Sequence, residues 1–431
     1  MKGRQISRRQ ALRILGAAGV AGGGSLLFQT TGVRAQAGAP AVRKKVKLLF
    51  WAFSDNPVHQ KMFVDTVDMF NKAQSFITVE LDATASAMEV RRKIAVALAA
   101  GSAPDLGATF QTHVQGLYDS NMLYPVDEFF NKWDGRADYF PTVIDAMRSR
   151  SNQPVLFMAN VTVPYLLYYR ADWFAEAKVN PPATYDEFLE AARKLSKPPD
   201  RYGYALRGGD YYGLQVIEPI WGSAGVKFVD ESGKVDFDSP QAMAITEKWV
   251  GMFTKDKSAQ PTAVSDRYPQ LFALMEGNKA AMWIYAIHGH PQLNSALGDR
   301  IQPAPIPKLK DKQCTLAIPE GHFIVSSCKE KEAAWEFLVH ICSGEPARIF
   351  SQKRGVLPVR KSLSAEPVFQ QNRFFKLAIS LASNWWRPPF SHEHWLNYQE
   401  KIAPYWQQAL RQEISVKDFH AQAVKLLRGE A

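Results

Sequence analysis

VKLLFWAF, residues 46–53, is an apolar run of the kind that forms a buried β-strand. Residues 57–73 follow with apolar side chains at helical spacing, and ITVELDAT, residues 77–84, alternates as a half-buried strand does. A strand, a helix and a second strand in this order are the start of an α/β unit.

The pattern continues for another helix and another strand. Ser86 and Glu89 form a capping box at the start of the expected second helix, and a third strand begins at Asp105. Residues 46–110 therefore predict the order β-α-β-α-β, which is typical of a mostly parallel sheet covered by helices. Ligands of such sheets bind beyond the carboxyl ends of the strands, so we expect a site in the loops after the first and third strands.

The remainder of the chain predicts further α/β structure. Thr184 and Glu187 form a second capping box, and residues 227–237 have the pattern of a β-hairpin. The C-terminal third is mainly helical, with a break at WWRPPF, residues 385–390. A chain of 431 residues is long enough for two domains, but no repeat or low-complexity linker separates them. We therefore expect two lobes joined by strands that cross between them.

Residues 1–37 have the pattern of a cleaved export signal. Basic residues precede an apolar run at residues 14–28, which is shorter than the roughly 18 to 20 residues of a spanning helix, and residues 35–37 read AQA, like a cleavage site. SRR at residues 7–9 resembles the twin-arginine signature, and an ordinary secretory signal is the alternative. No cysteine follows the apolar run, which argues against a lipid anchor. The glycines do not follow a strand, which argues against a dinucleotide loop.

Charge gives no case for nucleic acid or an anionic membrane as a partner. The formal net charge of the whole chain is +10, and residues 1–37 hold six basic and no acidic residues, so removing them leaves +4. A balance this small over a chain this long does not indicate binding to polyanions.

The cysteines do not indicate a metal or redox site. Cys314, Cys328 and Cys342 are an odd number and form no C-x-x-C pair. One pair could bridge in an oxidising compartment, and three buried thiols are the alternative.

Four segments, taken in order, resemble the family 1 extracellular solute-binding proteins. They are LAAGSAPDLGATFQTHVQGLYDSNMLYPVDEF (98–129), VPYLLYYRADWFAEAKVNPPATYDEFLEAARKL (163–195), FALMEGNKAAMWIYAIHG (272–289) and AAWEFLVHICSGEPARIFSQKRGVLPVRKS (333–362). The resemblance runs from about Lys47 to the C-terminus. It implies an α/β, two-lobed periplasmic-binding-protein fold with a ligand cleft between lobes joined by crossing strands.

The resemblance also implies a function and a division of the chain. Members of the family usually carry sugars to an ABC importer. For this chain we expect hinge closure, a monomer and no cofactor, since the sequence shows no cofactor site. The expected partners are a carbohydrate ligand and the membrane subunits of an ABC permease. The expected first lobe is residues 38–163 with 301–345, and the second is residues 164–300 with 346–431.

Sugars present hydroxyls, which need donors and acceptors, and C–H faces, which pack on aromatic rings. Candidate ligand-binding residues of these kinds lie at strand ends and beside the helical break. They are Asp55, Thr109, Gln111, His113, Asp210, Tyr211, Tyr285, His288, Trp386, Arg387 and Trp395.

Two positions depart from the pattern of the family. Arg170 stands where Asn is usual, and His288 stands where a ligand-stacking Trp is common. An imidazole gives less stacking area and adds a polar nitrogen, which favours a ligand with an extra hydroxyl or acidic group.

Enzyme, metal and scaffold functions are the alternatives. Asp55, Asp210 and Glu218 could supply a carboxylate pair for a carbohydrate-active enzyme. HGH (288–290) and SHEHW (391–395) contain histidines but lack the H-E-x-x-H spacing of a zinc helix. A receptor for a polyol or small anion, and an adhesin without a small ligand, complete the alternatives. The sequence favours a receptor that is not an enzyme and holds no metal.

Overall fold

A computed structural model describes residues 44–54, 57–85, 87–148, 150, 153–230, 234–310, 312–386 and 388–430. The expected export signal, the Ser86 cap and two candidate ligand residues, Asp55 and Arg387, lie outside these ranges. Within them, no helix is long and apolar enough to cross a membrane.

The N-terminal elements follow the predicted order β-α-β-α-β. The structure places β1 at Val46–Phe53, α2 at Pro57–Ala73, β2 at Ile77–Ala85, α3 at Ala87–Ala99 and β3 at Leu106–Phe110. Strand β1 is parallel to both β2 and β3. The prediction for residues 46–110 is therefore confirmed.

The prediction of a mostly parallel sheet is wrong for the rest of the sheet. Its main order is β2-β1-β3-β9-β5-β7-β6, and β9 (Thr315–Val325) is antiparallel to both β3 and β5 (Met158–Arg170). Strand β5 is also antiparallel to β7 (Ala280–Ala286), whereas β6 (Tyr202–Tyr204) is parallel to β7. Hydrophobic runs identify strands but not their direction, and β9 enters between β3 and β5 from far along the chain.

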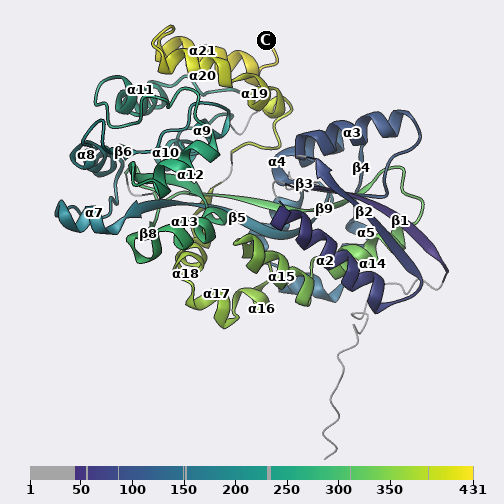
Figure 1. The fold of residues 1–431 in the computed structure, drawn as a ribbon. Helices are drawn as coiled ribbons and strands as arrows, with labels where there is room; N and C mark the ends of the chain where they lie inside the picture. The colour runs from purple at the N-terminus through teal and green to yellow at the C-terminus, as the bar shows by residue number, and fades with distance from the viewer. Residues whose placement is uncertain are drawn as a thin grey trace, which may run out of the picture. The chain divides into compact units, whose positions relative to one another are not determined.

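Strand β5 pairs with different partners along its length (Figure 1). Residues 158–164 pair with β9, and residues 165–169 pair with β7. Strand β8 (Ile301–Ala304) pairs with residues 167–170 of β5. Short strands complete the sheet, at Leu123–Tyr124 (β4, on β9), Leu357–Pro358 (β10, on β5) and Trp385–Trp386 (β11, on β9).

Helices make up most of the remaining described residues. The α-helices are α4 Gln111–Asp119, α5 Asp127–Phe130, α6 Pro141–Arg148, α7 Ala171–Glu176, α8 Tyr185–Leu195, α9 Tyr212–Gln215, α10 Glu218–Ala224, α11 Pro240–Thr254, α12 Tyr268–Glu276, α13 His290–Leu297, α14 Lys331–Ile341, α15 Gly344–Arg354, α16 Lys361–Ser364, α17 Pro367–Gln371, α18 Arg373–Ser380, α19 Trp395–Lys401, α20 Ala403–Leu410 and α21 Val416–Leu427. Short 3-10 helices lie at Asp134–Asp138, Ile287–Gly289, Gly298–Arg300 and Ala382–Asn384.

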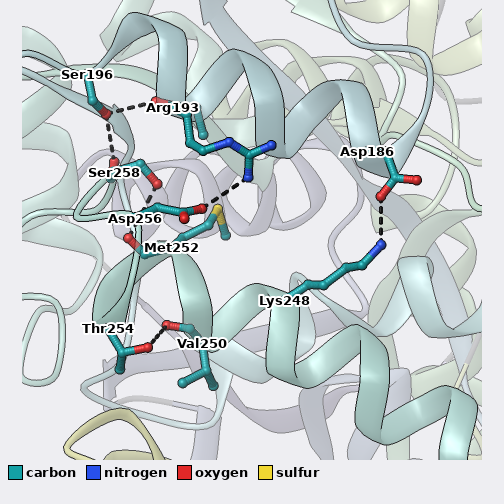
Figure 2. Close-up of polar contacts among 10 residues, drawn as sticks. Asp186, Arg193, Ser196, Lys248, Val250, Met252, Thr254, Asp256 and Ser258 are labelled. Atoms are coloured by element: carbon teal, nitrogen blue, oxygen red, sulfur yellow. Dashed lines mark hydrogen bonds and ion pairs between the residues drawn. The ribbon is translucent and has the colours of Figure 1, made fainter.

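Helix α8 illustrates how local sequence and packing agree. Its capping box at Thr184 and Glu187 is confirmed. Two ion pairs tie α8 to α11 and to the loop after it, Asp186 with Lys248 at 2.7 Å and Arg193 with Asp256 at 3.2 Å (Figure 2). Beneath them, apolar rings of both helices are buried, and this burial supplies most of the stabilisation because exposed ion pairs contribute little.

The predicted hairpin is confirmed where it is described. Val229 bridges Val235 in antiparallel fashion, and the backbone N–H of Asp230 donates to the carbonyl of Lys234 at 2.8 Å. Its turn lies outside the described ranges.

The three cysteines are buried and free, so no disulfide joins them. Burial raises the pKa of Cys342 well above its usual range, and such thiols are unreactive.

Helices α2 and α15 lie side by side although they are far apart in the chain (Figure 1). Arg354 at the end of α15 donates to His59 Nδ1 at 2.6 Å and pairs with Glu320 of β9 at 2.9 Å. His59 Nε2 lies 3.5 Å from the same carboxylate. This buried group connects the first turn of α2, immediately after the loop that follows β1, to the centre of the sheet.

Candidate functional site

The segment RGGDYYG, residues 207–213, connects β6 to α9 and is held tightly by its neighbours. A Cβ at Gly213 would lie 1.9 Å from the carbonyl oxygen of Arg207, and one at Gly209 would lie 2.4 Å from that of Ser265. Only glycine fits such close backbone approaches. The polar side chains of this segment are therefore carried on a fixed loop.

Arg207 lies between an acidic group and two exposed aromatic rings. Its Nη2 donates to Asp210 Oδ2 at 2.6 Å. Its guanidinium lies 5.0 Å from the ring centroid of Tyr212 and 5.9 Å from that of Tyr268. Both tyrosines are more than two-fifths exposed, so they offer an aromatic surface beside a charged group.

Tyr211 contacts the ring of Tyr212 at 5.7 Å, and its hydroxyl lies in a buried polar group. Its hydroxyl donates to Glu218 Oε1 at 2.8 Å, and its ring meets that of Tyr398 edge-on at 6.0 Å. Burial raises the pKa of Glu218 to about 8, against the opposing effect of the Tyr211 hydrogen bond. Glu218 is therefore mainly protonated at neutral pH.

Tyr165 and Tyr285 lie close to the same loop. Tyr165 donates to Gln215 Oε1 at 2.5 Å, and Tyr285 stacks on Trp283 and hydrogen-bonds His288 Nε2 at 3.1 Å. Burial raises the pKa of Tyr165 well above its usual range, with a smaller contribution from Tyr285. We call this set the tyrosine cluster, and its members are Tyr165, Arg207, Asp210, Tyr211, Tyr212, Gln215, Glu218, Tyr285, His288 and Tyr398.

A second group of candidates lies at the carboxyl end of β3. Thr109, Gln111 and His113 are all buried, and Gln111 Oε1 and His113 Nδ1 lack hydrogen-bond partners among the described residues. Burial, with a smaller effect of Arg91, lowers the pKa of His113 to about 4, so its ring is neutral. These are polar atoms left for water or a ligand.

The pairing of β3, β9 and β5 places Asn160 in line with this second group. Thr109 faces Gly321 of β9, and Gly321 faces Ala159 of β5, where a bulge places Asn160 as the extra residue. Asn160 is 1% exposed, and neither amide atom has a partner among the described residues. A buried amide without partners is costly unless a ligand or water satisfies it.

Helix α19 contacts elements of both groups. It packs against α4, which carries Gln111 and His113, and its Tyr398 faces Tyr211. Trp395 of α19 is 1% exposed and packs on Phe228, so in this structure it is a core residue rather than an open platform. Trp386 is half-buried beside Gly222, where a Cβ would lie 2.5 Å from its ring.

The sequence profile of the bacterial extracellular solute-binding proteins matches residues 17–341. The chain belongs to this family. It is therefore a solute-binding transport receptor rather than an enzyme, and the family description places it outside the cytoplasm.

Solved structures of such proteins share the fold of this solute-binding protein. One from Thermotoga lettingae, bound to α-D-tagatose, is 20% identical with a TM-score of 0.78, over 90% of this chain and 100% of that one. A Streptomyces glaucescens receptor solved with acarbose has the same identity, TM-score and coverage. An Agrobacterium radiobacter protein in complex with ribitol is 16% identical with a TM-score of 0.76, over 88% and 98% of the two chains. The expected periplasmic-binding-protein fold is confirmed.

Several members of the site were missing from the sequence prediction. Arg207, Tyr212, Tyr268 and Asn160 were not selected, and Glu218 was considered only as a hydrolase carboxylate. One usable signal was the isolated Asn in the apolar strand MANVTVPYLLYYR, residues 158–170. The exposed tyrosines gave no such signal, because their exposure depends on the tertiary structure.

Arg170, which departs from the family pattern, has a structural role. Its guanidinium donates twice to Asp172, at 2.9 and 2.6 Å, and once to Asn278 at 2.6 Å. It also stacks over Trp173 at 4.2 Å. These contacts fix the end of β5 and leave Arg170 out of the tyrosine cluster.

In the HGH motif, residues 288–290, His290 contacts other protein groups. His290 Nδ1 donates a hydrogen bond to the Ile287 carbonyl at 2.9 Å, and the His290 ring stacks on Phe374. In the described ranges, no group of three or more His, Cys, Asp or Glu side chains could hold a metal ion.

Proposed function

We propose that this protein is a periplasmic receptor that binds a carbohydrate or polyol and delivers it to the membrane subunits of an ABC permease. The observation that carries the proposal is the combination of unpartnered buried polar atoms at Asn160 and Gln111 with the exposed rings of Tyr212 and Tyr268. A polyhydroxylated solute needs both kinds of surface, donors and acceptors for its hydroxyls and rings for its C–H faces.

The solutes bound in the related structures support the same class of ligand for this protein. The related structures contain α-D-tagatose, acarbose and ribitol. Arg207 is already paired with Asp210, so the described site has no unpaired cation that would favour an anionic ligand. A neutral polyhydroxylated ligand fits this balance best.

The two lobes are part of the proposal, with boundaries adjusted to the packing. Strand β8 pairs with residues 167–170 of β5, which favours assigning residues 301–304 to the second lobe rather than the first. Helix α15 packs on α2, which favours assigning residues 346–354 to the first lobe rather than the second. Residues 38–163 and 164–300 keep their expected assignments.

The proposed mechanism is hinge closure about β5 and β9. Ligand contacts residues of both lobes only when they are closed, and this differential contact shifts the equilibrium toward the closed form. The closed monomer then docks on the permease. The leader at residues 1–37, with its arginine pair, directs export by the twin-arginine route.

A thermal-shift screen of the mature protein tests the proposal. Sugars, polyols and small anions are each added at saturating concentration, and a true ligand raises the melting temperature by mass action. Calorimetric titration then measures its affinity, and mass spectrometry checks that it stays intact. A shift with anions alone, or conversion of the ligand to product, would contradict the proposal.

A further inference from the structure

We propose that Glu218 is a positioning residue that holds Tyr211 in its site conformation while protonated, so that solute binding weakens when this carboxyl ionises. The inference rests on the proposed function. It concerns a residue that need not touch the solute itself.

The geometry makes Glu218 a fixed support for Tyr211. Glu218 is the first residue of α10 and is 0% exposed. Its Oε1 accepts the Tyr211 hydroxyl at 2.8 Å, and its Oε2 has no hydrogen-bond partner among the described residues. Tyr211 directly follows Asp210, which pairs with Arg207, so its position is linked to the charged part of the loop.

Among the residues that the structure describes, the groups around Glu218 offer no positive charge to balance an ionised carboxylate. The titratable side chains that interact with it are Tyr211 before α9, Tyr165 of β5 and Tyr398 of α19, all of them weak acids. The Arg207 charge acts on Tyr165, while burial raises the pKa of Glu218 and the Tyr211 hydrogen bond partly opposes this rise.

In the described ranges, the other elements packed against α10 do not supply a counter-charge either. Helix α11 carries Glu247 and Lys248, and Lys248 pairs with Asp186. Strand β9 carries His322 and Glu320, and Glu320 pairs with Arg354. None of these four groups contributes to the shifted pKa of Glu218.

Loss of the proton therefore has a structural consequence. A buried carboxylate without a described counter-charge, and without a protein partner at Oε2, needs hydration, since burying an unpaired charge is strongly unfavourable. Because Glu218 is 0% exposed, hydrating the ionised carboxylate loosens the packing of the first turn of α10. Tyr211 then loses its fixed acceptor, and the loop that carries Asp210 and Arg207 loses its preorganised geometry.

The first experiment needs no solute. Infrared difference spectra of the mature protein with and without Glu218→Gln should show a carboxylic-acid carbonyl band at neutral pH that the variant lacks. The band should disappear as the pH rises above about 8. Absence of this band at neutral pH would overturn the inference, whether or not a solute has been found.

The second experiment measures affinity against pH with the strongest ligand from the thermal-shift screen. For the unmodified protein, Kd should rise by about tenfold for each pH unit above about 8. Glu218→Gln keeps a neutral acceptor for Tyr211, so its affinity at neutral pH should match and its pH profile should be flat. Glu190→Gln, on the exposed side of α8, is the control and should follow the unmodified profile.

The outcomes separate the two proposals. A rise in Kd that persists in Glu218→Gln assigns the proton to another group and overturns the inference while leaving the receptor function intact. A screen without any ligand contradicts the receptor proposal, and the infrared band still decides the protonation of Glu218.

Discussion

His59 Nδ1 accepts a hydrogen bond from Arg354 Nη1 at 2.6 Å, across 295 residues of sequence. Both side chains meet Glu320, which is 1% exposed at its side chain. This contact joins α2, α15 and β9 at the point where α2 begins, so the start of α2 is held by residues far from it in the sequence.

Arg354→Ala should destabilise the ligand-free protein by about 3–5 kcal/mol, because it leaves the buried Glu320 carboxylate without its strongest partner. Urea unfolding at neutral pH measures the change. Arg348→Ala on the same helix is the control, and it should cost about 1 kcal/mol or less since its ion pairs are partly exposed. Equal costs for both variants would argue against a special role for the buried group.

Asn160→Ala should weaken solute binding by about 1–3 kcal/mol, because the ligand loses a hydrogen-bonding group in a buried position. The melting temperature without ligand should not fall, since this amide has no partner among the described residues. Calorimetric titration beside an unliganded melt checks both statements. A large loss of stability with unchanged affinity would place Asn160 outside the site.

His288→Ala should weaken binding markedly with little change in unliganded stability. The substitution removes the hydrogen-bond partner of the Tyr285 hydroxyl. The Tyr285 ring still stacks on Trp283, which holds it in place. The comparison variant is Tyr285→Phe, which removes the same hydrogen bond but keeps the imidazole. If only Tyr285→Phe lowered affinity, the tyrosine hydroxyl rather than the histidine would be the ligand group.

The stability of the protein should fall in acid through His322. Burial, with a smaller effect of His59, lowers the pKa of His322 to about 3 from its ordinary 6.5. The unfolded chain therefore binds a proton between these values that the folded protein does not, so stability present above pH 6.5 is lost as the pH falls toward 3.

His322→Phe should reduce this loss of stability at low pH, because a phenyl ring binds no proton. The new ring suits the site, since His322 lies among Phe50, Phe63 and Phe350. Denaturant unfolding at several pH values is the measurement, with His394→Phe, at a half-exposed position, as the control. An acid limb of undiminished slope in His322→Phe would assign the proton uptake to other groups.

Arg8→Lys together with Arg9→Lys should leave precursor in the cytoplasm, because the twin-arginine pair is read as an address rather than as charge. Fractionation followed by immunoblotting distinguishes precursor from mature protein. An unchanged yield outside the cytoplasm would assign the leader to the general secretory route.

Local patterns predicted much of this fold because local physical rules govern it. The order of elements in residues 46–110 and the capping box at Thr184 followed from periodicity and capping chemistry. The antiparallel entry of β9 between β3 and β5 could not be predicted, because strand direction depends on contacts between distant residues.

The same distinction applies to the site. Thr109 and Asp210 follow from the rule that ligands bind beyond strand termini, and they stay predictions; the structure places Thr109 at the end of β3 and Asp210 in the loop after β6. Trp395 was selected as a platform for its residue type, but its burial depends on Phe228 and α19, which no local pattern reveals. Burial also gives Glu218 its proton, so its role was visible only once its neighbours were known.

The place of β9 in the sheet sets the order in which the chain can fold. Strands β3 and β5 are made early, but β9 begins only at Thr315, and it is their shared neighbour. Until β9 emerges from the ribosome, both strands expose unpaired edges that can pair with other chains. The nascent protein therefore passes through a long aggregation-prone stage, and chaperone protection during synthesis matters more for it than for a chain whose central strands are neighbours in sequence.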